Sequence, residues 1–124
     1  MLHIQRNNMT QKIVINACHG GFGLSDAATE LYGKLTHQNL VRGSESLFGK
    51  SSWYVNEIAD ENFFYDGNIP RDCRYLVQVV QQLGLAANGR YSTLKVVDVP
   101  DDVEWFIAEY DGWEHVAEMH RTWG

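Results

Sequence analysis

A glycine-rich turn between an apolar run and a helical pattern constrains the fold more than any other feature. The apolar run ends at Ala17, residues 20–23 read Gly-Gly-Phe-Gly, and Ser25 opens a stretch with helical spacing. Backbone N–H groups, the positive end of a helix dipole and an aromatic ring can meet in such a strand–loop–helix unit. We therefore expect an anionic ligand that carries a ring to bind at this turn.

The size and composition of the chain indicate one globular domain. It has 124 residues, of which 44% are hydrophobic, and a chain of this length can bury a packed core. We expect residues 1–11 to form an N-terminal extension and residues 12–124 to form the domain. The N-terminus lacks the apolar middle of a signal peptide, and no apolar run approaches the roughly 20 residues of a membrane span. These features predict a cytoplasmic protein with no membrane partner.

The net charge and the cysteine content limit the kinds of partner and bond that we expect for this chain. The formal net charge is −6, which disfavours DNA, because nonspecific affinity for DNA comes from many phosphate contacts. Cys18 and Cys73 form neither a CxxC motif nor a disulfide framework, so we expect both to be reduced. A small anion can still bind where arginines converge, and the candidates are Arg6, Arg42, Arg71, Arg74, Arg90 and Arg121.

Hydrophobic periodicity predicts an α+β fold: a small antiparallel sheet with two main helices in a single, oligomeric domain. Ser25 is the expected N-cap of the first helix, and the second helix is expected to open at residues 70–72 and end at Gly84. Residues 36–50 are interpreted as a loop. The expected strands cover residues 12–17, 52–58 and 93–99.

The C-terminal part of the chain allows two interpretations. Trp105 and Ile107 alternate with polar residues ahead of Asp111-Gly112, a favoured type I′ hairpin turn. A helix from Asp102 onward fits the same residues less well, so a hairpin is preferred. Aromatic residues concentrate in this segment and in a tail that we expect to be docked, which predicts an oligomer contact there; the tryptophans are Trp105, Trp113 and Trp123.

The glycine-rich turn matches neither common nucleotide-binding fingerprint. It lacks the Gly-Lys-Ser/Thr ending of a Walker A loop, and Asp26 stands where Gly-x-Gly-x-x-Gly needs a glycine. Gly21 and Ser25 are candidate ligand contacts. Phe22 either stacks on a ligand ring or is a core residue.

The sequence predicts no catalytic residue, no metal and no cofactor. Histidines do not occur in the i, i+4 spacing of a helical zinc site, and His115 with Glu118 supplies only half of a carboxylate-bridged site. The nucleophile elbow Gly-x-Ser-x-Gly is absent, and Cys18 and His19 are adjacent, which is poor geometry for a nucleophile and its base.

Four further residues are candidate contacts, each with a plainer alternative. Arg71 and Arg74 in the first turn of the second helix form a phosphate fork or surface ion pairs. Asn88 is a turn residue or reads a ribose or adenine edge. Arg121 pairs with the neighbouring Trp123 or belongs to a ligand wall at a subunit interface.

Taken together, these motifs resemble a family of small phage proteins, of which the first described type of Thoeris anti-defence sponge is the best understood branch. The resemblance covers nearly the whole chain after the first ten or so residues, except residues 36–69. The matching segments are residues 13–16 (Ile-Val-Ile-Asn), 20–25, 76–84, 87–89, 94–105, 109–112 and 120–123.

This resemblance implies a binding protein and not an enzyme. Such sponges bind cyclic ADP-ribose isomers made by TIR-domain sensors, some also hold cyclic oligonucleotides, and they assemble as homodimers or as hexamers (trimers of dimers) with ligands at subunit interfaces. Asn88 and Phe22 match family binding positions, and Arg71 and Arg121 match basic motif positions. Asp72-Cys73-Arg74 departs from the family's Thr-or-Asn, Asp, Pro pattern. The expected ligand contacts are Gly21, Phe22, Ser25, Arg71, Arg74, Asn88, Arg90 and Arg121.

Two rival functions follow from the same residues. A cyclic-nucleotide hydrolase or lyase would use His19 and Asp26 as its first base and acid candidates. A protein-binding phage inhibitor would use the aromatic C-terminal segment.

Overall fold

A two-stranded antiparallel ribbon, apolar on both faces, lies at the centre of the fold. The computed structural model describes residues 9–45 and 51–119. Strand β1 (Thr10–Asn16) pairs with β5 (Leu94–Pro100), with Ile13 opposite Val97. Val14 packs in a cluster with the helices, whereas Ile13 and Ile15 pack in a separate cluster. Burial on both faces explains why the β1 sequence is a continuous β-branched run rather than an alternating one.

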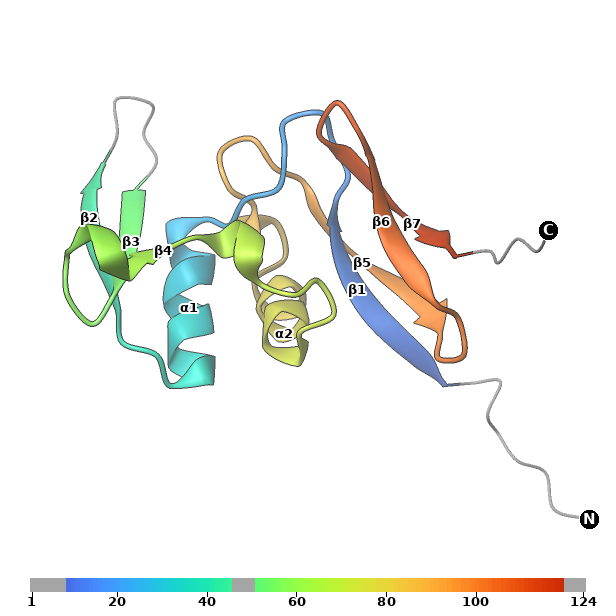
Figure 1. Ribbon diagram of the computed structural model, residues 1–124, viewed down its shortest axis with the longest axis horizontal. Coiled ribbons are helices and arrows are strands. Elements are labelled where there is room, and N and C mark those ends of the chain that lie inside the picture. The colour runs from blue at the N-terminus through green and yellow to red at the C-terminus, as the bar shows by residue number, and fades with distance from the viewer. Residues whose placement is uncertain (1–8, 46–50, 120–124) are drawn as a thin grey trace, which may run out of the picture.

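Two helices form a layer on one side of this ribbon: the second helix lies against the ribbon, and the first packs on the far side of the second (Figure 1). Helix α1 (Asp26–Thr36) begins after Ser25, whose hydroxyl accepts a hydrogen bond from Ala28 N at 3.1 Å, so the predicted N-cap is confirmed. Helix α2 (Arg74–Leu83) ends at Gly84, which has φ +58°. The main core lies between the helices and the ribbon; its buried members include Val14, Ala28, Tyr32, Leu76, Val79 and Val80.

A hairpin covers the opposite face. Strands β6 (Trp105–Tyr110) and β7 (Trp113–Glu118) pair in register across Asp111 and Gly112, both at positive φ. Positive φ at both central residues is the requirement of a type I′ turn. The predicted hairpin is therefore confirmed, and the alternative helix from Asp102 is excluded.

A small sheet extends the molecule beyond α1, at the left of Figure 1. It contains β2 (Leu40–Glu45), β3 (Ser51–Val55) and β4 (Phe63–Phe64), all antiparallel. Short 3₁₀-helices connect the remaining elements: η2 (Asp60–Asn62), η3 (Asp66–Asn68) and η4 (Gly84–Ala87). The architecture is the α+β single domain with antiparallel sheets that the sequence predicts.

Four predicted boundaries are wrong. The strand expected over residues 52–58 ends at Val55. Residues 36–50 are not all loop, because Leu40–Glu45 forms β2 by pairing with the following strand, and this pairing does not show in the pattern of residues 40–45 themselves. The first strand begins at Thr10, which pairs with Pro100, and not at residue 12. Helix α2 begins at Arg74 and leaves Arg71 outside it, since the Arg71 carbonyl accepts the Val14 N–H at 2.8 Å and is bound to the ribbon.

Some expectations lie beyond the described residues. The docked tail with Arg121 and Trp123 lies outside them, as does most of the predicted N-terminal extension. In the described ranges, no helix is long and apolar enough to cross a membrane.

Candidate functional site

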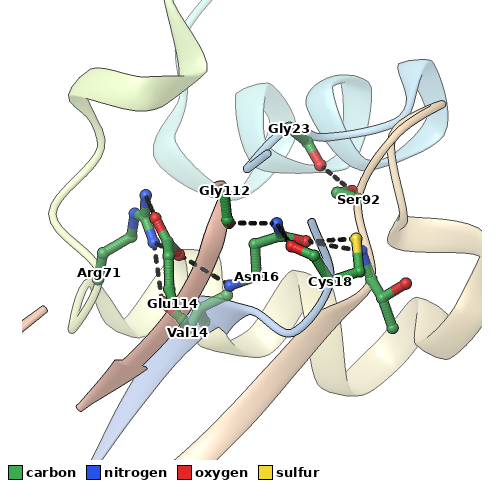
Figure 2. Close-up of polar contacts among 9 residues, drawn as sticks. Val14, Asn16, Cys18, Gly23, Arg71, Ser92, Gly112 and Glu114 are labelled. Carbon is green, nitrogen blue, oxygen red and sulfur yellow. Dashed lines mark hydrogen bonds and ion pairs between the residues drawn. The ribbon is translucent and has the colours of Figure 1, made fainter. Parts of the chain in front are cut away.

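Two loops meet at one end of the central ribbon. The glycine loop (residues 20–23) follows β1, and the Asn88 loop (residues 88–91) precedes β5. Gly89 N donates to the Gly23 carbonyl at 3.1 Å, and the Ser92 hydroxyl donates to the same oxygen at 2.6 Å (Figure 2). These bonds hold the two loops together as one wall, although the loops are far apart in the sequence.

Glycine is required where the two loops touch. A Cβ on Gly20 would lie 1.8 Å from the carbonyl oxygen of Tyr91, and one on Gly89 would lie 2.9 Å from the carbonyl carbon of Gly23. Both distances are far inside van der Waals contact, and the obstructing atoms are backbone. The glycines therefore serve a close approach of two backbones, which only glycine permits.

The two loops and the first turn of α1 enclose a cavity of about 390 Å³. This volume falls in the range of small-molecule sites, roughly 300–1,000 Å³. The structure brings most of the predicted contacts together here: Gly21, Phe22, Ser25, Asn88 and Arg90 all line the cavity.

Successive backbone N–H groups along the glycine loop are available for a ligand. Within residues 9–45 and 51–119, the N–H groups of Gly21, Phe22 and Gly23 donate to no other residue, whereas the next one, at Leu24, donates to Asp66 Oδ2 at 3.0 Å. Gly21 has φ +93°, a conformation suited to glycine. A run of unpaired N–H groups beside the N-terminus of α1 is an arrangement that binds anions.

Side chains complete this wall. The Asn88 Oδ1 atom accepts the Leu94 N–H at 2.8 Å, which orients the amide. Arg90 brings a positive charge, with its guanidinium 5.5 Å from the Tyr91 ring centroid. Asp26 also lines the cavity, but its carboxylate is ion-paired with Arg42 at 3.0 Å. The charge of Asp26 is therefore compensated and does not repel an anion strongly.

Ser25 has a structural role at the edge of the cavity. Its hydroxyl accepts the Ala28 N–H and donates to the Ala86 carbonyl at 2.6 Å. Its backbone N–H donates to Ala87. Ser25 thus fixes the start of α1 against η4 and positions the wall, rather than offering its own hydroxyl to a ligand.

Arg71 belongs to a separate polar cluster with Asn16 and Glu114 and does not line the cavity (Figure 2). Its guanidinium makes two bonds to the Glu114 carboxylate, one of them Nη2 to Oε2 at 2.8 Å. The two side chains are only 16% and 10% exposed. Arg71 is therefore committed to Glu114 and is not a phosphate fork.

Phe22 joins this cluster to the cavity. The Arg71 guanidinium carbon lies 3.7 Å from the centroid of the Phe22 ring, and Phe22 also packs against the main core while lining the cavity. The core interpretation of Phe22 is thus met in part, and stacking on a ligand ring stays a prediction. Its ring is anchored by core contacts and a stacked cation, and it still contributes to the cavity wall.

Asn16 is a polar residue of the cluster that sequence reasoning missed. It is fully buried, and its amide donates to the carbonyls of Cys18 and Gly112 while accepting the Thr93 N–H at 2.8 Å. Its backbone N–H donates to Glu114. An asparagine at the end of a buried β-branched strand was the available indication, because buried amides need several partners. Asn16 fixes the path of the chain into the glycine loop.

Arg74, a predicted contact that the structure describes, does not line the cavity. Arg74 lies at the start of α2, where its guanidinium donates to the Tyr75 hydroxyl at 2.7 Å. It lines a different depression, together with Asp72 and Asp101. Arg121 lies outside the described residues.

The residues proposed for catalysis have other partners. The His19 ring contacts the Asp111 carbonyl at 3.1 Å and the Trp113 ring, and Asp26 is held by Arg42. Cys18 Sγ contacts the Tyr91 carbonyl at 3.2 Å, and a hydrogen bond from the Gly20 backbone lowers the pKa of this thiol. In the part of the chain that the structure describes, no three His, Cys, Asp or Glu side chains gather as a metal site.

Comparison of the chain with protein-family models, with curated proteins and with solved structures finds no match. The function is therefore inferred from the geometry of the cavity and from the residues that form it.

Proposed function

We propose that this chain is a phage anti-defence sponge that binds a cyclic ADP-ribose isomer in the glycine-loop cavity. The observation that carries the proposal is the wall lined by Gly21, Phe22 and Gly23, whose N–H groups have no partner among the described residues, together with Arg90 and Asn88. Such a wall suits a pyrophosphate linked to a ring. The ligand would be the signal made by a TIR-domain sensor in the host cytoplasm, withheld from the Thoeris effector and not cleaved.

Each part of the wall has a distinct role in this proposal. The glycine-loop N–H groups donate to pyrophosphate oxygens, and Arg90 adds a charge-assisted hydrogen bond. The Asn88 Nδ2 group donates to a ribose or base edge. Phe22 offers the edge or face of its ring, held rigid by Arg71. A preorganised wall loses little entropy on binding, which favours slow release.

Self-association is part of the proposal. The outer face of the β6–β7 hairpin carries aromatic side chains that are largely exposed: Phe106 at 46%, Tyr110 at 77% and Trp113 at 45%. The cross-strand pairs Phe106–Ala117 and Tyr110–Trp113 put these side chains on one face. Exposed apolar patches of this kind mark interfaces, and a homodimer, or a hexamer built as a trimer of dimers, would cover it. Sedimentation of wild type and Tyr110→Glu tests this: the variant should sediment as a smaller species.

The binding proposal is tested by a thermal-shift screen followed by recovery of the ligand. The screen covers NAD, ADP-ribose, its cyclic isomers and cyclic oligonucleotides, the second ligand class implied by the resemblance. A cyclic ADP-ribose isomer should raise the melting temperature and return chemically intact when the complex is heated. Recovery of a cleaved product would replace the sponge by a hydrolase or lyase. Absence of any shift, together with capture of a host protein, would favour a protein-binding inhibitor.

A further inference from the structure

A second cavity adjoins the glycine-loop cavity. It has a volume of about 300 Å³, and Leu24, Asp26 and Ser51 line both cavities. Its remaining walls are mostly aromatic and come from β3, β4 and η3: Trp53, Phe63, Phe64 and Tyr65. Because they share these residues, the two cavities are neighbouring parts of one depression. The glycine-loop wall lies on one side of it, and the aromatic wall lies on the other.

The aromatic wall is held in place although much of it is exposed. Phe64 pairs with Trp53 across the β3–β4 ladder, and its ring lies 5.9 Å from Tyr32 of α1. Phe63 and Tyr65 are 54% and 55% exposed. Gly67 lets the Tyr65 ring fold back, since a Cβ there would lie 2.5 Å from Cζ of that ring. Exposed rings in fixed positions offer faces on which a flat ligand can stack.

Asp66 supplies an acceptor at the floor of this second cavity. Asp66 is only 8% exposed, and its Oδ2 atom accepts a hydrogen bond from the Leu24 N–H at 3.0 Å. Oδ1 accepts no hydrogen bond from the described residues. Every fully buried side-chain oxygen among these residues has a partner, so Oδ1 is not fully buried. Oδ1 therefore keeps some exposure to solvent, and Asp66 is one of the residues that line the cavity.

The other carboxylate of the second cavity is already engaged. Asp26 accepts the Trp53 indole N–H and the Ser51 hydroxyl, both at 2.9 Å, besides its ion pair with Arg42. Asp66 is thus the carboxylate with capacity for a ligand donor. A carboxylate beside aromatic faces selects a flat ring that carries N–H donors, because an unpaired donor or acceptor at a buried carboxylate is costly.

We propose that the second cavity holds the base of the ligand, and that Asp66 accepts a hydrogen bond from an exocyclic amino group of that base. This inference rests on the proposed function, in which the pyrophosphate lies on the glycine loop. Leu24 connects the two halves: its N–H is held by Asp66, directly after the N–H groups that face the pyrophosphate. The site thereby selects an amino-substituted purine over an oxo-substituted one.

Titration calorimetry with two matched ligands tests the inference. One is a ribose-linked cyclic ADP-ribose isomer, whose adenine amino group is free; the other is its hypoxanthine counterpart, which presents an oxygen at that position. Wild type should bind the adenine ligand at least tenfold more tightly. Asp66→Asn should reverse this preference, because the amide oxygen keeps the bond from the Leu24 N–H and the Nδ2 group then donates to the oxygen of the hypoxanthine ligand.

A second variant tests the same site and does not depend on whether Asp66→Asn folds. Phe63→Ala removes an exposed ring and should weaken both ligands about tenfold through lost stacking. Leu85→Ala, which removes an exposed apolar side chain that lines neither cavity, is the control and should leave both affinities unchanged. Equal changes in Phe63→Ala and Leu85→Ala would count against the base site.

The outcomes separate the inference from the function on which it rests. Equal affinity of wild type for the adenine and hypoxanthine ligands overturns the base site and leaves the sponge proposal standing. Competition by arginine amide, together with equal affinity for the two bases, would show that Asp66 holds a simple cation and would also overturn it. Failure of both nucleotides to bind overturns the proposed function and the base site together.

Discussion

The Asn16–Arg71–Glu114 cluster and the glycine-loop wall are both polar, and both lie at the same end of the ribbon, but they differ in how their groups are satisfied. In the cluster, Glu114 accepts bonds from Arg71 and from the Asn16 N–H, and Asn16 uses both its amide atoms. In the wall, the N–H groups of Gly21, Phe22 and Gly23 have no partner among the described residues.

We infer from this difference that the cluster maintains the structure and that the wall binds the ligand. A buried polar group with every bond made inside the protein specifies the fold and has nothing left for a ligand. A group whose donor faces a cavity gains when a ligand arrives. The cluster should therefore determine stability and the wall should determine affinity, and substitutions in each region should change one quantity far more than the other.

The largest effect is expected in the cluster. Glu114→Gln leaves the guanidinium of Arg71 without its counter-charge in a largely buried place and should lower the free energy of unfolding by about 3–5 kcal/mol. Urea denaturation measures this loss. Asp98→Asn, which breaks the exposed Lys12–Asp98 pair, is the control and should cost less than about 1 kcal/mol. Similar losses in the two variants would contradict a structural role for the cluster.

The next effect is on affinity, at the wall. Arg90→Ala removes a charge-assisted hydrogen bond of about 1.5–3 kcal/mol, which is roughly tenfold to 150-fold in the dissociation constant for a cyclic ADP-ribose isomer. Calorimetric titration measures it, and urea denaturation should show little change. Arg74→Ala removes the same charge far from the cavity. If it weakened binding as much as Arg90→Ala does, the wall would not be the anion site.

A smaller effect on both quantities is expected where the loops touch. Gly20→Ala drives a Cβ into the Tyr91 carbonyl and should cost about 1–3 kcal/mol of stability while it moves the two loops apart and weakens binding. Gly23→Ala is the matched control for stability, because a Cβ there meets nothing within 4 Å. Thermal denaturation of both variants compares them, and equal losses of stability would show that the loop contact is unimportant.

The smallest effect concerns Cys18, which lies between the two regions. The Gly20 backbone lowers the pKa of its thiol from 9.0, so its thiolate forms at lower pH in the folded protein than in the unfolded chain. Alkylation of Cys18 should begin at lower pH in native than in urea-unfolded protein. This hydrogen bond adds stability at alkaline pH, and the addition disappears as the pH falls through the lowered pKa. An alkylation profile that is unchanged by unfolding would refute the Gly20 contact.

The sequence is sufficient to predict the parts of the fold that depend on local chemistry. Ser25 as an N-cap and Asp111-Gly112 as a hairpin turn follow from the preferences of those residues, and the structure confirms both. The glycine loop and Asn88 were also expected at one site, and they line one cavity. Residues 40–45 were missed as a strand because their pairing with β3 is not encoded in their own pattern.

The roles of charged residues depend on partners that are remote in the sequence. Arg71 and Glu114 are 43 residues apart, and Asn16 and Glu114 are 98 apart. No spacing rule connects them, so Arg71 was predicted to bind phosphate when its charge is neutralised internally. Asp66 is not among the contacts expected from the sequence, since its contact with Leu24 arises from the way η3 packs against the end of the glycine loop.

Backbone amide exchange followed by NMR, with and without a saturating cyclic ADP-ribose isomer, compares the two polar regions in one experiment. The ligand should slow exchange at Gly21, Phe22 and Gly23, whose N–H groups have no partner among the described residues, and leave Asn16 unchanged, because its N–H is already bonded to Glu114. Saturated ligand without protection of the glycine loop, or with protection centred on Asn16 and Glu114, would contradict a binding site built on that loop.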